Sequence, residues 1–98
     1  MTPRLFLRAA AKADLREVFE WYEARSTGLG FEFLRAARAV LALIERNPSQ
    51  FPVVLEDIRR SHLLRFPYAV YYFIEDQRIV VIACAHGRRH PRRWASRR

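Results

Sequence analysis

The spacing of apolar residues changes midway along this 98-residue chain, and that change limits what it can fold into. Between positions 11 and 46 the apolar residues recur every three or four positions, the spacing of one face of an α-helix. From position 58 to 85 they form β-branched and aromatic runs, which are typical of strands. The order of helices followed by strands predicts an α+β fold.

Two helices are expected in the first half. The first begins near Ala11 and runs to the polar break at Ser26, with an apolar face formed by Leu15, Val18, Phe19 and Tyr22. The second runs from Leu29 to Arg46, where Asn47 and a proline end it. Because the connection is short, the two helices are predicted to form an antiparallel hairpin.

Four strands are expected around the helices. A short run at Leu5–Leu7 opens the chain, and three strands follow at Ile58–Leu64, Ala69–Ile74 and Arg78–Ala85. The polar turn at 75–77 predicts that the last two strands pair as a hairpin. The expected fold is therefore a single domain over residues 1–98, in which an antiparallel sheet packs against the helical hairpin.

The excess of positive over negative charge is confined to the second part of the chain. Residues 1–57 carry eight basic and eight acidic residues, whereas residues 58–98 carry ten arginines and two acids, a net charge of +8 (10 − 2). A basic tail begins at about residue 88, and it predicts an anionic partner. Arginine accounts for 17 of the 18 basic residues; either phosphate recognition or a genome rich in G and C would produce that ratio.

Several kinds of site are not expected. Cys84 is the only cysteine and lies in an apolar run, so it predicts a buried thiol rather than a disulfide or a thiolate metal site. The three histidines, His62, His86 and His90, lack companion ligands, and no metal or other cofactor is expected. Arg8 and Lys12 interrupt the N-terminal apolar stretch, and no run is long enough to span a bilayer, so we expect a cytoplasmic protein.

Four basic residues are candidates for catalysis. Arg60 and His62 are two positions apart in a predicted strand and therefore share a face of the sheet. His86 and Arg89 follow the last strand and would join them if the strands are neighbours. Such a cluster would suit phosphoryl chemistry on RNA, with histidine moving protons and guanidinium groups stabilising charge. The alternative is that these are ordinary solvated or structural residues.

A second set of residues is expected to bind an anionic target without chemistry. Its charged members lie in or directly after a predicted strand and in the tail, and its aromatic member would stack on an unpaired base. The set comprises Arg59, Arg65, Arg88, Arg92, Arg93 and Trp94.

Three segments resemble the ParE/RelE toxin superfamily of type II toxin-antitoxin systems, also called plasmid stabilisation proteins. They are AxADLxEVFEWY at 11–22, FxxxxxxxxxLIERNPxxFP at 33–52 and FPYAVYYFIEDQRIVVIACAHGRRHPxxW at 66–94. The resemblance covers nearly the whole chain and implies the same fold, a small sheet against a helical hairpin.

The superfamily has two activities. RelE-like members cut messenger RNA in the ribosomal A site, whereas ParE-like members poison DNA gyrase without known cleavage. In RelE-like proteins an arginine follows the tyrosine of the FPY-like turn, but here Ala69 follows Tyr68. Arg60, His62 and Arg89 match other basic positions of the RelE-like site, and His86 does not discriminate between the two groups. The resemblance therefore favours a gyrase inhibitor over an mRNA interferase, and a non-toxic nucleic-acid-binding module is the third interpretation.

The resemblance also implies a cognate antitoxin that inhibits the toxin in a hetero-oligomeric complex. Both helices carry apolar residues outside their narrow apolar stripes. These are Trp21, Phe31 and Leu43, and they are candidates for the antitoxin-binding surface. The alternative is that they complete the core.

Overall fold

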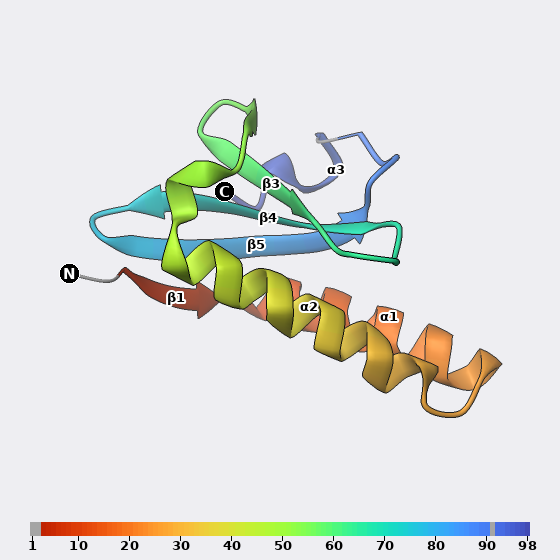
Figure 1. Ribbon diagram of the computed structural model, residues 1–98. Helices are drawn as coiled ribbons and strands as arrows, with labels where there is room; N and C mark the ends of the chain where they lie inside the picture. Colours follow the sequence, from red (N-terminus) through yellow and green to blue (C-terminus); the bar gives the residue numbers. More distant parts are fainter. Residues whose placement is uncertain (1–2, 91) are drawn as a thin grey trace.

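The computed structural model describes residues 3–90 and 92–98 and contains the predicted order of elements, one strand, two long helices and then strands (Figure 1). The elements are β1 (Arg4–Leu7), α1 (Ala9–Arg25), α2 (Leu29–Arg46), the 3-10 helix η1 (Pro48–Gln50), β2 (Val53–Leu55), β3 (Ile58–His62), β4 (Tyr68–Glu75), β5 (Arg78–His86) and α3 (Arg92–Ala95). The predicted α+β class is confirmed. Within the described residues, no helix is long and apolar enough to cross a membrane.

The five strands form one sheet in the order β1-β5-β4-β3-β2. The predicted antiparallel pairing of β3, β4 and β5 is confirmed. The expectation of a wholly antiparallel sheet is wrong at one edge, because β1 pairs parallel to β5. Strand β2 was not predicted; it has three residues and follows Pro52, so it shows almost no alternation.

The helical hairpin covers one face of the sheet (Figure 1). Its core includes Phe33 and Ile44 of α2 together with Val70 and Tyr72 of β4, all of them buried. The helices approach closely at Gly30, where a Cβ atom would lie 2.7 Å from the Phe19 carbonyl oxygen.

A carboxylate at the end of α1 joins the two helices. Glu23 accepts hydrogen bonds of 2.9 Å from the backbone amides of Gly28 and Gly30, which satisfies donors at the start of α2. The N-cap residue of α2 is Gly28, which has no side chain to cap the helix, so an acid from the neighbouring helix takes the place of the usual cap.

The opposite face of the sheet is also buried. Residues Ala69 to Phe73 of β4 are buried without interruption, and Tyr71 and Phe73 belong to a second core with Ile58, Ile82 and Trp94 of α3. A β-bulge between Tyr71 and Tyr72 shifts the pairing of β4 with β5. The C-terminal segment thus covers this second face of the sheet. The sequence did not predict an element that would do so.

Candidate functional site

The basic C-terminal segment folds back onto the sheet instead of extending into solvent. Arg97 Nη1 donates to Asp14 Oδ2 at 2.6 Å, and Arg98 Nε donates to Asp57 Oδ1 at 2.8 Å. The Arg98 guanidinium also lies 3.8 Å from the centre of the Phe73 ring. The two terminal arginines therefore anchor the segment, and their positive charges are paired with carboxylates of the same chain.

Trp94 is part of the core and not of the surface. Its side chain is 2% exposed, and its ring centroid lies 3.8 Å from that of Tyr71. The expectation that Trp94 stacks on a target base is wrong for this conformation, since the ring already stacks within the protein. A tryptophan in a run of arginines gives no sequence signal that separates these two roles.

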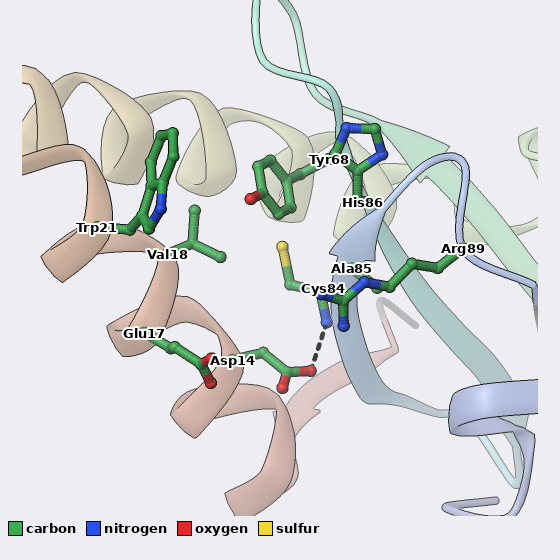
Figure 2. A pocket seen from close by; sticks show the side chains of 9 residues that line it. All are labelled: Asp14, Glu17, Val18, Trp21, Tyr68, Cys84, Ala85, His86 and Arg89. Atoms are coloured by element: carbon green, nitrogen blue, oxygen red, sulfur yellow. Dashed lines mark hydrogen bonds between the residues drawn. The ribbon is translucent and has the colours of Figure 1, made fainter.

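A pocket of about 200 Å³ lies between α1 and the end of β5 (Figure 2). We call it the α1–β5 pocket; it is lined by Asp14, Glu17, Val18, Trp21, Tyr68, Cys84, Ala85, His86 and Arg89. The rings of Tyr68 and His86 lie 5.5 Å apart on one side, and two carboxylates of α1 lie on the other. Neither acid, Asp14 or Glu17, was expected from the sequence to be a site residue.

Asp14 connects this pocket to the C-terminal segment. Its Oδ2 accepts a hydrogen bond of 3.0 Å from the Cys84 backbone amide, drawn as the dashed line in Figure 2, as well as the bond from Arg97. Burial, together with the nearby Asp14 charge, raises the pKa of the Cys84 thiol to about 12. The thiol is therefore protonated at neutral pH and is not a nucleophile.

The structure does not bring the four candidate catalytic residues onto one face. In the β3–β4 register Arg60 is opposite Tyr71, which places it on the face that α3 covers. His62 is opposite Ala69 at the end of β3, where it is exposed and also borders a groove between α2 and β3. His86 is opposite Tyr68, the residue next to Ala69, so its side chain points to the other face of the sheet. There it lies in the α1–β5 pocket, on the side of the helical hairpin. The predicted convergence of these groups is wrong in this respect.

Arg60 lies partly inside the second core. Its Nε atom and the hydroxyl of Tyr71 are buried, and neither has a hydrogen-bond partner among the described residues. Burial raises the pKa of Tyr71, and the neighbouring Arg60 charge partly offsets that effect. His62, by contrast, is exposed and lies beside Gly87, where a Cβ atom would be 3.4 Å from the His62 Cε1 atom.

The residues expected to bind a target are dispersed. Arg59 donates to the carbonyls of Ser49 and Phe51, at 3.1 and 2.6 Å, and so holds the chain between α2 and β2. Arg65 lies 3.9 Å from Glu32 in an exposed ion pair. The remaining three, Arg88, Arg92 and Arg93, are exposed in the C-terminal segment.

The three candidates for antitoxin binding also separate. Leu43 lines an apolar groove of about 390 Å³ between α2 and β3, together with Val40, Phe51 and Leu64, the last of which is 79% exposed. We call it the α2–β3 groove. Trp21 and Phe31 do not line it, although both are about half exposed: Trp21 borders the α1–β5 pocket, and the Phe31 ring packs 5.0 Å from the Phe19 ring.

Comparison with known proteins decides the family. The profile of the family described as the ParE toxin of the type II toxin-antitoxin system parDE matches residues 5–91. The chain belongs to the ParE toxin family. It is 29% identical over 92 residues to Toxin ParE2 from two strains of Mycobacterium tuberculosis, CDC 1551 / Oshkosh and ATCC 25618 / H37Rv, which covers 93% of this chain and 88% of each relative.

A solved structure shares the fold. A chain of the chromosomal ParDE toxin-antitoxin system from P. aeruginosa superposes with a TM-score of 0.68 at 16% identity, covering 87% of this chain and 96% of that one. The resemblance to the ParE/RelE superfamily is thus confirmed, and the family is that of the toxin component of a type II toxin-antitoxin system.

Proposed function

We propose that the chain inhibits DNA gyrase as a non-enzymatic, cytoplasmic toxin and that a cognate antitoxin neutralises it. The observation that carries the choice of target is the environment of Ala69. This residue occupies the position after Tyr68, is fully buried and is paired with Ala85. No guanidinium extends from that position, and a transition state on phosphorus would lack the stabilising charge expected of a ribonuclease.

The separation of basic residues supports the same choice. Arg60 and His62 share one face of the sheet, whereas His86 lies beside Tyr68 on the other. General acid–base catalysis requires the proton-transfer groups to lie within hydrogen-bond reach of the same substrate atoms. This arrangement favours binding of a target over cleavage of one.

A gyrase supercoiling assay beside a reconstituted translation reaction tests the target. We expect the purified chain to inhibit supercoiling and to leave messenger RNA intact on the ribosome. Ribosome-dependent cleavage that disappears in Arg89→Ala would instead establish the RelE-like alternative.

For the antitoxin we propose the α2–β3 groove as one docking surface. Its floor is apolar, from Val40, Leu43 and Phe51, and its rim carries Leu64 with almost no cover. An antitoxin segment with apolar anchors would bury this surface as it folds onto the toxin. The groove includes Leu43, whereas Trp21 and Phe31, the other two candidates from the sequence, lie outside it and stay a prediction.

Coexpression with the neighbouring reading frame tests this docking surface. Leu64→Asp should keep the chain toxic but weaken its neutralisation, because a charge would then face the apolar floor. Val53→Asp is the matched control, since Val53 is also an exposed apolar residue, 47% exposed, but does not line the groove. Equal rescue of both variants by the antitoxin would contradict the assignment, and harmless expression of the chain alone would contradict the toxin function.

A further inference from the structure

A second cavity, of about 250 Å³, lies where the C-terminal segment crosses α1 and β5. It is lined by Asp14, Cys84, Ala85, Arg89, Arg93, Trp94 and Arg97. Three of these residues are arginines spaced four positions apart in the sequence. We call this cavity the tail cavity.

The charges in the tail cavity are not balanced. Asp14 pairs with Arg97, whose Nη1 and Nη2 atoms lie 2.6 and 3.4 Å from the two carboxylate oxygens. Neither Arg89 nor Arg93 lies within ion-pair distance of an acid anywhere in the described parts of the chain. The one carboxylate among the lining residues is thus paired with Arg97, and the other two guanidinium groups have no ion-pair partner among the described residues, an arrangement that an anion would stabilise.

The third arginine is held in place rather than free. Arg97 also donates to the Ile82 carbonyl at 3.2 Å, and Asp14 is itself fixed by the Cys84 amide. An anion entering the cavity would therefore meet a fixed wall formed by the Arg97–Asp14 pair and two free guanidinium groups. Guanidinium groups bind phosphate through two parallel N–H donors, which gives such a wall geometric selectivity.

We propose that the tail cavity binds a backbone phosphate of a nucleic acid, with Arg89 and Arg93 as the contacting residues. The surroundings favour a polymer over a free phosphate ion, because exposed Arg88 and Arg92 continue the positive surface beyond the cavity and residues 88–98 contain no acid. A polyanion releases counterions along the whole surface, whereas a single phosphate gains only the local contacts. The proposal does not depend on gyrase being the target.

Two double variants that remove equal charge test the site. Arg89→Gln/Arg93→Gln changes the cavity, and Arg88→Gln/Arg92→Gln changes two neighbouring arginines that do not line it, although all four residues are exposed. Binding of a fluorescent DNA oligonucleotide, single- or double-stranded, is measured by anisotropy over a range of salt concentrations. We expect the cavity variant to lose about tenfold or more in affinity and the control variant several-fold less, because charge-assisted hydrogen bonds are lost only in the first.

The salt dependence gives a second readout. The slope of log K against log salt should fall by roughly one for each phosphate contact removed. Equal weakening by both double variants, or no weakening by the cavity variant, would overturn the site. An oligonucleotide that binds no more tightly than inorganic phosphate, titrated alone in the same buffer, would overturn the nucleic-acid ligand.

These measurements use purified protein and do not require toxicity. A chain that is harmless in cells but shows the expected pattern contradicts the proposed toxin function and leaves the cavity assignment intact. A chain that inhibits growth without binding the oligonucleotide contradicts only the cavity assignment.

Discussion

Replacement of Trp94 by alanine is expected to destabilise the fold severely. The indole is 2% exposed and stacks on Tyr71 at 3.8 Å, so its removal leaves a cavity between α3 and the sheet. Truncation of a buried aromatic side chain costs about 3–5 kcal/mol. A domain of this size has a total stability of about 5–15 kcal/mol. The loss would therefore be a large share of the free energy of unfolding.

Two further variants separate packing from other effects. Trp21→Ala removes the other tryptophan, which is 48% exposed and contacts Arg25 and Tyr22, and should cost only about 1 kcal/mol. Trp94→Phe should cost less than Trp94→Ala, since it keeps a ring against Tyr71 and removes an indole N–H that is buried without a hydrogen-bond partner among the described residues.

Urea unfolding followed by circular dichroism at 222 nm measures all three variants. We expect stability to increase in the order Trp94→Ala, Trp94→Phe and wild type, with unchanged m-values. Equal losses for Trp94→Ala and Trp21→Ala would refute the packing of the C-terminal segment on the sheet.

Three other variants or modifications follow from local geometry. Gly30→Ala should lower the free energy of unfolding by about 1–3 kcal/mol in urea titrations, because the new methyl group would meet the Phe19 carbonyl at 2.7 Å and backbone cannot move aside freely. Gln77→Gly should raise it by about 0.5–1 kcal/mol in the same assay, since Asp76 and Gln77 both have positive φ in a two-residue hairpin turn that favours glycine. Cys84 should resist alkylation at pH 8 in the native protein and react in urea, because burial raises its pKa to about 12; rapid labelling of the folded chain, followed by mass spectrometry, would contradict this.

Much of the fold could be predicted because the spacing of apolar residues differs between the helical and the strand-forming parts of the chain. The α2 stripe and the strands β4 and β5 are long enough for their patterns to be read, and the turn at Asp76 and Gln77 lies between two apolar runs. Strand β2 and helix α3 could not be predicted, because β2 has three residues that directly follow a proline and α3 lies in a run of arginines, so neither shows an apolar pattern that stands out from its surroundings.

The candidate site was less predictable, for a reason of register. Arg60 and His62 were correctly expected to share a face, which follows from the two-residue period within one strand. The position of His86 depends on the pairing of β4 with β5, and the bulge at Tyr71 shifts that pairing by one residue. When the pairing shifts by one residue, each side chain beyond the shift points to the opposite face of the sheet. The residue pattern within a single strand cannot predict such a shift.

Tertiary contacts also changed the role of the tail. Arg97 and Arg98 pair with Asp14 and Asp57, which are 83 and 41 positions away in the sequence. Composition alone counts these arginines as free charge. The structure leaves Arg89 and Arg93 as the unbalanced pair that faces a cavity.

The most direct test of the proposed function is a supercoiling assay with purified gyrase, the purified chain and its antitoxin. We expect the chain alone to inhibit supercoiling and the antitoxin to restore it. Leu64→Asp should weaken the restoration but not the inhibition. Full gyrase activity in the presence of the chain, together with cleavage of messenger RNA on the ribosome, would contradict it.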